Sequence, residues 1–584
     1  MPFLDSIRKK AKQWLLYNDD NIKQEVSKLL DGDPELLYDA FYKDIEFGTS
    51  GFRAIMGAGT NRINSYTLAK ITIGLCRYIK KKNPSRKTFK AVVAYDIRKG
   101  SDVLAKSVAQ VFSSQGLEVY LFDGFRPTPE LSFALKLLQA DTGVMITASH
   151  NSSQYNGYKL YWKGGGPIDP FYEKALMEEI HNVSFDEISF NSKDDAPLRK
   201  PLGEKMDDEF INACIKNASF GIKKKNKEQI KILFTPLHGV TVTILPKAFK
   251  KAGFLDFHLV EQQTLVDGTF PTVSSPNPEE AASFSMALAY AKKIKPDLIL
   301  ASDPDGDRLG VGLYHAKEGY VLLNGNQTNT LLSYFLLENY QKKYTLDKHF
   351  FMVTTLVSSD IFFALANHFN INMKVSPTGF KWITRMIEKK QKHEKFIGGG
   401  EESFGFMVGD FLRDKDAITS SLLISEMAAS LISHKETLYN KLIAIYLTLG
   451  YYHDKTLYKV YEGEKGKLKM NKIMEDFRKN PPISFLNSQV IEIEDYLIGK
   501  RFFVHKNIEE ELGFPSSFNL LIYRLNDGSK IALRPSGTEP KIKVYFNLKR
   551  ILRNKDQYFL IKEQLDEQII QSCKEDKNLL RIFS

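Results

Sequence analysis

Short apolar runs that end in polar or glycine-rich loops recur along the chain, and this feature restricts the possible folds most. The first clear example, "FKAVVAYD" (residues 89–96), is rich in β-branched and small apolar residues. It is followed by "SDVLAKSVAQVFSSQG" (101–116), whose apolar positions recur at helical spacing. We expect Ser101 to cap the start of this helix and Gly116 to lie at its end. The stretch therefore predicts a strand, a loop and a helix.

The same pattern returns three more times. Apolar runs ending in polar residues occur in "KILFTPLHGV" (231–240), "DLILASDPDGDR" (297–308) and "FFMVTTLVSSD" (350–360). Strands that alternate with helices favour an α/β fold with largely parallel sheets. In such sheets, ligands bind beyond the carboxyl ends of the strands. The polar loops after these runs are therefore the places where we expect a functional site.

The length of 584 residues requires several domains, because a single hydrophobic core stops growing at about 250 to 300 residues. Changes in composition along the chain suggest where they divide. We expect an N-terminal helical extension over 1–40, three α/β domains over 41–203, 204–316 and 317–444, and a smaller α+β domain over 445–584.

Composition excludes several classes of protein. Hydrophobic residues make up 43% of the chain and charged residues 26%, as in soluble globular proteins. The three cysteines are far apart and form no CxxC pair, so neither a disulfide framework nor a zinc site is expected. The first residues lack the apolar core of a secretion signal, and no run of about 18 apolar residues occurs. We expect a cytoplasmic protein with no membrane partner.

The formal charge of +11 raises the question of a nucleic-acid partner. The lysine runs at 80–82 and 223–225 lack the interleaved aromatic residues of a single-strand binding surface. No nucleic-acid partner is therefore expected, and the charge is equally compatible with anionic substrates or with no specific partner.

The loop "SDPDGDR" presents three carboxylates, Asp303, Asp305 and Asp307, at every second position. In a curling loop this spacing brings three hard oxygen ligands together, which suits Mg²⁺. A calcium-binding EF-hand begins similarly, but it requires glycine where this chain has Arg308 and glutamate where it has Tyr314. A phosphatase with an aspartyl nucleophile could also display "DPDGD", yet it would not need the other loops described next.

Four further loops offer groups that bind sugars and phosphates. In "GGGEESFG" (398–405), glycines let the backbone approach a ligand, and carboxylates and a hydroxyl can pair with sugar hydroxyls. In "RPSGTEPK" (534–541), a guanidinium, two hydroxyls and free backbone N–H groups can surround a phosphate. "EFGTSGFR" (46–53) and "SPTGFKWI" (376–383) add hydroxyl and basic groups in glycine-containing turns.

Taken together with "TASHNSSQYNGYK" (147–159), these loops resemble those of the α-D-phosphohexomutase superfamily. The resemblance runs from residue 48 to residue 541. It implies four domains around a central cleft, of which three are related α/β domains and the fourth is a smaller α+β domain. The extension, with "FTPLHG" and "SSPNPEE", is similar to the longer bacterial-type phosphoglucomutase and phosphopentomutase branch.

The resemblance also implies roles for individual residues. Ser149 would be phosphorylated in the resting enzyme and would hold Mg²⁺ together with Asp303, Asp305 and Asp307. Arg53 and Arg308 would contact the phosphoserine, and His150 and Lys159 are the acid/base candidates. The implied substrate ligands are Thr378, Gly379, Lys381, Glu401, Ser403, Lys415, Arg534, Ser536, Gly537 and Thr538, with Arg413 as a further candidate.

The function implied is an intramolecular phosphotransfer that interconverts glucose 1-phosphate and glucose 6-phosphate. It would proceed through the phosphoserine and glucose 1,6-bisphosphate, which would serve as intermediate and activator. The alternative is a phosphomannomutase or phosphopentomutase with the same mechanism. Either way, the expected partners are small sugar phosphates. The chain departs from the family at Ser152, where a proline often follows "TASHN", so its serine loop lacks the fixed φ that proline provides.

Overall fold

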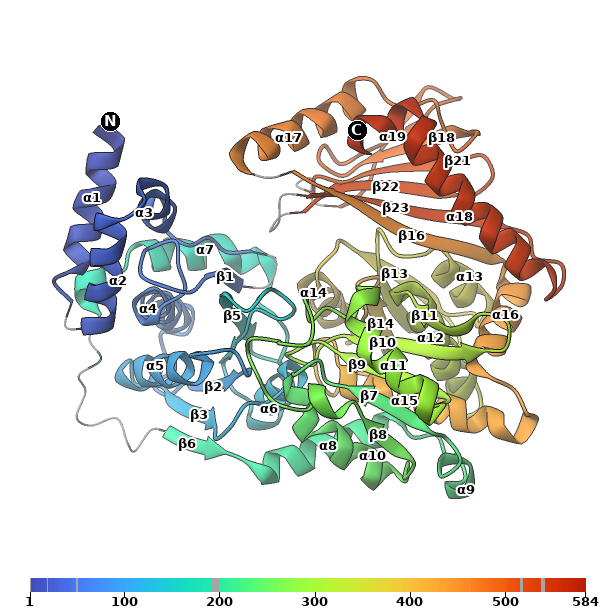
Figure 1. Ribbon diagram of the computed structural model, residues 1–584, viewed down its shortest axis with the longest axis horizontal. Coiled ribbons are helices and arrows are strands. Elements are labelled where there is room, and N and C mark those ends of the chain that lie inside the picture. Colours follow the sequence, from blue (N-terminus) through green and yellow to red (C-terminus); the bar gives the residue numbers. More distant parts are fainter. Residues whose placement is uncertain are drawn as a thin grey trace. The chain divides into compact units, whose positions relative to one another are not determined.

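The computed structural model describes residues 2–17, 19–48, 51–188, 190, 199–461, 463–514, 518–536 and 541–583 (Figure 1). The chain divides into two compact units, each made of two segments. The first unit holds Met1–Leu332 and Gly379–Lys435, and the second holds Ser333–Thr378 and Glu436–Ser584.

The N-terminal residues form three helices: α1 (Pro2–Trp14), α2 (Asp20–Asp31) and α3 (Pro34–Phe41). The side chains of Asp19 and Asp33 accept backbone N–H groups at the starts of α2 and α3, which satisfies donors that a helix leaves unpaired. Trp14 is buried, and its ring packs against the rings of Phe41 and Tyr66. The extension therefore has an apolar core that it shares with the domain that follows.

The first sheet has the strand order β1-β5-β4-β2-β3-β6. Its strands are β1 (Gly51–Ile55), β2 (Lys90–Tyr95), β3 (Glu118–Phe122), β4 (Thr142–Ile146), β5 (Tyr155–Trp162) and β6 (Arg199–Leu202). Strand β2 is parallel to β3 and β4, whereas β5 is antiparallel to β4 and β1. The accompanying helices are α4 (Ser65–Lys82), α5 (Ser101–Ser114), α6 (Thr128–Leu138), α7 (Pro170–His181) and the short η1 (Phe185–Glu187).

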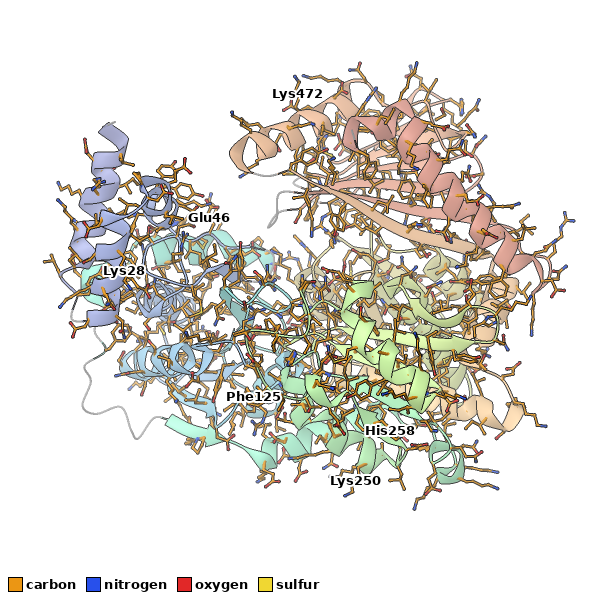
Figure 2. The ribbon with its side chains drawn as sticks, viewed as in Figure 1. Lys28, Glu46, Phe125, Lys250, His258 and Lys472 are labelled. Carbon is orange, nitrogen blue, oxygen red and sulfur yellow. The ribbon has the colours of Figure 1, made fainter. Side chains whose placement is uncertain are left out.

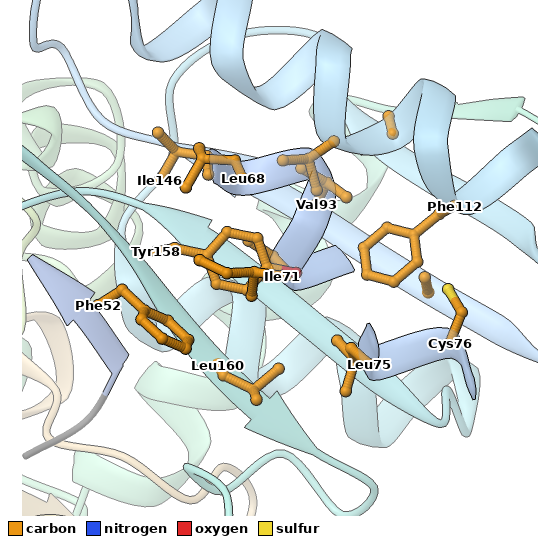
Figure 3. Packing of buried hydrophobic residues seen from close by; sticks show 14 of the residues in the cluster. Phe52, Leu68, Ile71, Leu75, Cys76, Val93, Phe112, Ile146, Tyr158 and Leu160 are labelled. Carbon is orange, nitrogen blue, oxygen red and sulfur yellow. The ribbon is translucent and has the colours of Figure 1, made fainter. Parts of the chain in front are cut away.

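The core of this domain lies between the sheet and its helices. Phe52 from β1, with Tyr158 and Leu160 from β5, points toward apolar residues of α4 and toward Phe112 of α5 (Figure 3). Because side chains alternate across a strand, the residue between Tyr158 and Leu160 faces the other side of the sheet. That residue is Lys159.

The second sheet of the first unit has the order β11-β10-β9-β7-β8. Its strands are β7 (Ile232–Thr235), β8 (Phe257–Leu259), β9 (Leu298–Ser302), β10 (Leu309–His315) and β11 (Gly319–Leu323). Strand β7 is parallel to β8 and β9, and β10 is antiparallel to β9 and β11. The helical elements are α8 (Glu204–Ala218), α9 (Lys224–Lys227), η3 (Val240–Thr243), α10 (Leu245–Ala252), η4 (Glu261–Gln263), η5 (Ala281–Phe284) and α11 (Ser285–Ile294).

The rest of the first unit comes from the third part of the chain. It contains α14 (Phe380–Lys390), β14 (Lys395–Glu401), β15 (Gly405–Val408), α15 (Ala417–Leu431) and η6 (Ile432–His434). Helix α12 (Gly325–Gln341) begins in the first unit and continues into the second. Strands β14 and β15 are antiparallel, with Glu401 opposite Gly405, so residues 402–404 form a tight turn between them.

The second unit contains two sheet regions. Strands β12 (Phe350–Thr355) and β13 (Asn372–Ser376) are parallel and are connected by α13 (Ile361–His368). An eight-stranded antiparallel sheet contains β16 (Tyr451–Val460), β17 (Ser484–Phe485), β18 (Ser488–Asp495), β19 (Lys500–Phe503), β20 (Ile508–Glu511), β21 (Leu521–Leu525), β22 (Lys530–Pro535) and β23 (Lys541–Arg550). The helices are α16 (Leu438–Leu449), α17 (Gly463–Lys479), α18 (Gln557–Glu575) and α19 (Lys577–Phe583).

Residues from both segments of the second unit share one core. Leu356 and Val357 pack with Ile522 and Ala532 of the large sheet. Beside this core, Lys530 Nζ donates to Asp360 Oδ1 at 2.6 Å. Residues 333–378 are therefore held to the C-terminal strands by both apolar and ionic contacts.

The predicted alternation of strands and helices is confirmed. The four apolar runs form β2, β7, β9 and β12, and the predicted helix is α5. One detail is wrong: Gly100, not Ser101, occupies the N-cap position of α5. The Ser101 hydroxyl donates to Asp96 Oδ1 at 2.8 Å, because a buried carboxylate competes for it. Among the described residues, no helix combines the length and apolar character that a membrane crossing requires.

Basic side chains are distributed over many elements. Lys28 on α2, Lys250 on α10 and Lys472 on α17 are all exposed (Figure 2). These three lysines belong to separate parts of the sequence.

Candidate active site

Ser149 lies in the turn that follows β4. Its φ is +53°, in the left-handed region that side chains other than glycine seldom adopt. Such a conformation costs on the order of 1 to 3 kcal/mol and persists only where its surroundings enforce it. Here the Ser149 backbone N–H donates to Thr147 Oγ1 at 2.8 Å, and the Ser149 side chain is buried. A strained and buried serine at the end of a strand is a candidate functional group.

The aspartate loop follows β9 and contacts this serine. Asp303 Oδ2 accepts a hydrogen bond from Ser149 Oγ at 2.8 Å. The other oxygen of Asp303 accepts the backbone N–H groups of Asp307 at 3.1 Å and Arg308 at 3.0 Å. The turn is completed at Gly306, which has a φ of +70°. The structure thus brings together the two loops that the sequence singled out.

Lys159 reaches the same loop from β5. Its Nζ donates to Asp305 Oδ2 at 2.5 Å and to Asp307 Oδ2 at 2.8 Å. Burial alone would lower the pKa of Lys159, but the two carboxylates hold this pKa above its ordinary value. Lys159 is therefore a buried ammonium that is charged at neutral pH.

Lys415 contributes a second cation. Its Nζ lies 3.3 Å from Asp307 Oδ2 and 3.1 Å from Asp414 Oδ1. Gly405 makes room for the side chain, because a Cβ at that position would lie 2.1 Å from Lys415 Cδ. Burial opposes the charge, yet Asp307 and Asp414 raise the pKa of Lys415 well above its ordinary value. The predicted substrate ligand Lys415 therefore lies beside the aspartate loop.

The three aspartates have the arrangement of a metal site. One oxygen from each of Asp303, Asp305 and Asp307 can be chosen so that all three lie within 4.8 Å of one another. Asp305 Oδ1 and Asp307 Oδ1 are buried and accept no hydrogen bond from the described residues. Leaving a buried acceptor unpaired costs about 1 to 3 kcal/mol, and more when it is charged.

The protonation of the cluster supports the same interpretation. Burial and the charges of Asp305 and Asp307 raise the pKa of Asp303 well above its ordinary value. Burial would raise the pKa values of Asp305 and Asp307, but the nearby Lys159 ammonium keeps both below their ordinary value. A divalent cation would relieve this repulsion and use the two unpaired oxygens. The residues present therefore fit Mg²⁺, a hard cation that prefers oxygen ligands.

The loop between β14 and β15 is attached to the aspartate loop. The Leu309 backbone N–H donates to Phe404 O at 3.0 Å, and Glu401 O accepts from Asn329 Nδ2 at 2.9 Å. Glu401 Oε1 accepts from the Gly379 backbone N–H at 2.6 Å, so these two predicted sugar ligands are in contact. Burial raises the pKa of Glu401. Ser403 lies half-buried in the same turn.

Other predicted residues have different partners. Lys381 donates to Glu173 on α7 at 2.6 Å, and Arg308 pairs with Glu279 and lies 3.8 Å from Asp307. The Arg53 guanidinium donates to Asn151 Oδ1 at 3.2 Å, and His150 Nδ1 lies 3.3 Å from Ser149 Oγ. Arg413 pairs with Glu388 and Asp410. Their predicted roles toward phosphate and sugar stay predictions.

The remaining predicted ligands belong to the second unit. Thr378 is half-buried in the loop after β13, and Arg534 lies on β22. The Ser536 backbone N–H donates to Lys541 O at 2.8 Å. Gly537 and Thr538 lie outside the described residues. The phosphate-binding role of this loop stays a prediction.

Sequence reasoning missed three residues that shape the site. Arg98 contacts the serine loop, Thr128 contacts Asp305, and Glu279 pairs with Arg308. Arg98 follows the predicted strand 89–96, so a search of every loop after a strand would have found it. Thr128 stands between two prolines, a sign of a helix start, but nothing in the sequence pairs it with Asp305.

Comparison with known proteins identifies the family of the chain. Three domain models of phosphoglucomutase/phosphomannomutase, described as alpha/beta/alpha domains I, II and III, match residues 44–187, 208–315 and 324–446. Phosphoglucomutase from Staphylococcus aureus is 36% identical over 515 residues, which cover 88% of this chain and 91% of that protein. The predicted resemblance to phosphohexomutases is confirmed.

Solved structures show the same fold. Parafusin, a phosphoglucomutase from Paramecium in its open form, gives a TM-score of 0.65 at 16% identity, covering 91% of this chain and 96% of that chain. A phosphoglucomutase/phosphomannomutase family protein from Burkholderia thailandensis gives 0.63 at 17%, covering 91% and 98%. The predicted fold class, three α/β domains followed by a sheet-rich C-terminal domain, is confirmed. The chain belongs to the phosphoglucomutase/phosphomannomutase family and is a phosphohexose mutase.

Proposed function

We propose that this enzyme interconverts glucose 1-phosphate and glucose 6-phosphate, with Ser149 as the carrier of the phosphoryl group. The observation that carries the proposal is the hydrogen bond of 2.8 Å from Ser149 Oγ to Asp303, inside a cluster of carboxylates with two unpaired oxygens. A buried serine in this setting is suited to hold a phosphoryl group beside a cation. The relatives named phosphoglucomutase favour glucose as the sugar.

The proposed reaction has two transfers that balance each other. First, the sugar O6 attacks the phosphorus on Ser149, so the O6–P bond forms, the Oγ–P bond breaks and Oγ takes a proton. The product, glucose 1,6-bisphosphate, then turns end over end. In the second transfer Ser149 Oγ loses its proton and attacks the phosphorus on O1, so the Oγ–P bond forms, the O1–P bond breaks and O1 takes a proton. This restores the phosphoserine and releases glucose 6-phosphate. Catalysis then depends on positioning and on neutralising charge.

The residues of the site divide this work. Asp303, Asp305 and Asp307, with an oxygen on Ser149, would hold Mg²⁺, which when bound neutralises negative charge on the phosphoryl oxygens. Because Asp305 and Asp307 raise the pKa of Lys159, its ammonium can stabilise charge or donate a proton, but it is a poor base at neutral pH. This leaves His150, 3.3 Å from Ser149 Oγ, as the candidate base.

The predicted ligands would serve the rest of the substrate. Thr378, Gly379, Lys381, Glu401, Ser403 and Lys415 would bind the sugar, and Arg53 and Arg308 the phosphoserine. Arg534, Ser536, Gly537 and Thr538 would bind the phosphate that is not being transferred. The hydrogen bond from the Gly379 backbone to Glu401 supports the proposal that these two loops bind the same sugar. Added glucose 1,6-bisphosphate would activate enzyme that has lost its phosphoryl group.

Mass spectrometry of the intact protein and its peptides tests the carrier. We expect one phosphate on Ser149 in the purified enzyme, and Ser149→Ala should lose both the phosphate and the turnover. Ser152→Ala and Ser153→Ala, three and four residues further along, serve as matched controls and should keep both. A phosphate on Ser152 or Ser153 would refute the assignment of Ser149.

A coupled assay across sugar phosphates tests the substrate. Glucose 1-phosphate should give the highest kcat/KM among glucose, mannose and ribose 1-phosphates, and EDTA should abolish turnover until Mg²⁺ is restored. A higher kcat/KM with mannose or ribose 1-phosphate would instead establish a phosphomannomutase or phosphopentomutase. The family model that matches this chain covers both phosphoglucomutase and phosphomannomutase, so it does not identify the sugar. The ratio of kcat/KM values between the sugar phosphates does.

A further inference from the structure

Arg98 holds the backbone of the serine loop. It lies just after β2, and its side chain has no exposed surface. Its two terminal nitrogens donate to four carbonyl oxygens of that loop. The acceptors are Ser149 O at 2.7 Å, Asn151 O at 2.5 Å, Ser152 O at 2.7 Å and Tyr155 O at 2.9 Å.

The guanidinium is itself held in place. Its Nε lies 3.3 Å from Asp96 Oδ2, while Asp96 Oδ1 accepts from Ser101 Oγ at 2.8 Å and from the Arg98 backbone N–H at 3.0 Å. The ring of Phe270, whose centroid is 5.1 Å away, covers the guanidinium. Contacts outside the serine loop therefore fix both the position and the orientation of the guanidinium.

The geometry of arginine matches this task. A guanidinium carries two N–H groups on each terminal nitrogen in a fixed plane, so four carbonyls use all four of these donors. Lysine has the same charge but only three donors, and they rotate about a flexible stem. Holding the Ser149 carbonyl restricts the peptide that follows it, and Ser149 is the residue with the strained φ of +53°.

The contacts of Arg98 also restrain the serine loop at the position where the sequence lacks a proline. Ser152 stands where proline often fixes this loop, and serine imposes no φ of its own. The Ser152 carbonyl is one of the four that Arg98 holds. A buried side chain thus restrains the loop from outside, in place of a restraint within it.

We propose that Arg98 is a positioning residue for phosphoryl transfer. It fixes the serine loop so that Oγ, and the phosphoryl group it carries, stays directed at Asp303 and the sugar rather than at water. This inference rests on the proposed role of Ser149 as carrier. Arg98 would thus favour phosphoryl transfer to the sugar over hydrolysis without itself touching substrate or metal.

Arg98→Lys tests the proposal, with Arg86→Lys as the control. Arg86 lies in the same domain, but its side chain is half exposed and pairs with Asp141. For Arg98→Lys we expect kcat about 100-fold lower with the KM for glucose 1-phosphate changed less than about 3-fold, because misplacement of a reacting group affects the chemical step. We also expect the isolated phosphoenzyme to lose its phosphate to water several-fold faster, followed by intact mass. Arg86→Lys should match the wild type in all three.

Two further measurements separate positioning from folding. Added methylguanidinium should restore part of the turnover of Arg98→Ala, because it can refill the space and remake the carbonyl contacts. If the Arg98 variants do not fold, Phe270→Leu keeps the arginine and removes only its covering ring, and kcat should fall about 3- to 10-fold at constant KM.

The results also distinguish this inference from the function on which it rests. A wild-type enzyme without phosphate on Ser149 would refute the proposed carrier. A wild-type enzyme phosphorylated on Ser149, with wild-type kcat and phosphate loss in Arg98→Lys, or in Phe270→Leu if the arginine variants do not fold, would refute only the positioning role. Absence of methylguanidinium rescue in a folded Arg98→Ala would also count against that role.

Discussion

Thr128 holds Asp305 through two hydrogen bonds, from its hydroxyl to Asp305 Oδ2 at 2.8 Å and from its backbone N–H to Asp305 O at 2.9 Å. Lys159 donates to the same Oδ2. Both side-chain donors therefore occupy one carboxylate oxygen and leave Oδ1 as the unpaired oxygen. In this way the first residue of α6 selects which oxygen of Asp305 is presented to a cation.

Thr128→Val should weaken metal binding. Valine keeps the shape of threonine but cannot donate to Oδ2, so only Lys159 still holds that oxygen and the carboxylate is less restrained. We expect Mn²⁺ affinity of the dephosphorylated enzyme to fall about 10-fold, which corresponds to roughly 1.4 kcal/mol, the size of one hydrogen bond to a charged group. Titration followed by electron paramagnetic resonance measures this. Thr128→Ser should bind normally, and unchanged affinity in Thr128→Val would contradict the role.

Lys159→Gln should change metal binding and turnover in opposite directions. Removing the ammonium takes away a cation that competes for Asp305 and Asp307, so Mn²⁺ should bind several-fold more tightly. Turnover should fall by about 10²- to 10⁴-fold, because a positioned charge or proton donor is lost. The exposed Lys163, four residues further along, gives the control Lys163→Gln, which should change neither. A decrease in both quantities would show that Lys159 only supports the structure.

Asp416→Asn should remove part of the dependence of stability on pH. Burial raises the pKa of Asp416 to about 6, from an ordinary value of 3.8. Between these values the unfolded chain has released the proton and the folded chain retains it, so the free energy of unfolding falls as pH rises from about 4 to about 6 and is constant above that. The size of this loss is roughly 2 to 3 kcal/mol.

Asparagine at this position caps α15 as well as aspartate does, accepting from the Ile418 backbone N–H, but it does not titrate. Hydrogen exchange of α15 amides in urea, measured from pH 4.5 to 7.5, should therefore show the decline in the wild type and a smaller one in the variant. Parallel declines in both proteins would rule out Asp416 as the titrating group.

Trp14→Ala should destabilise the N-terminal extension. Trp14 is 2% exposed, and its loss would leave a cavity against Phe41 and Tyr66. The expected cost is about 3 to 5 kcal/mol. Leu16, 84% exposed, gives the control Leu16→Ala, which should cost less than about 0.5 kcal/mol. Limited proteolysis between α1 and α2 compares them, and equal resistance would show that the extension does not depend on this core.

The sequence predicted the strands well because four buried runs of apolar residues end abruptly in polar loops. One of these runs also leads to the three aspartates, whereas Ser149 was singled out by the resemblance to phosphohexomutases. It could not show that Ser149 and Asp303 touch, because they are 154 positions apart and only the packing of two sheets brings them together.

The residues that sequence reasoning missed have ordinary surroundings in the sequence. An arginine after a strand usually points to solvent. The role of Arg98 becomes visible only in the structure, where its guanidinium donates to buried carbonyl oxygens of the serine loop. The wrong cap at Ser101 has the same origin: Asp96, five residues earlier, accepts its hydroxyl inside the core. Helix signals are local, whereas competition for a buried hydrogen bond depends on the whole fold.

The pairing of Asp360 with Lys530 sets an order for folding on the ribosome. The first unit is complete once Lys435 has been synthesised, but Leu356 and Val357 belong to a core whose other members are made much later. Asp360 can form its ion pair only after Lys530, 170 residues further along, has been synthesised. At about 5 to 20 residues per second this takes roughly 10 to 30 s. During this interval the nascent chain exposes an apolar segment, and chaperones that bind such segments would engage it there.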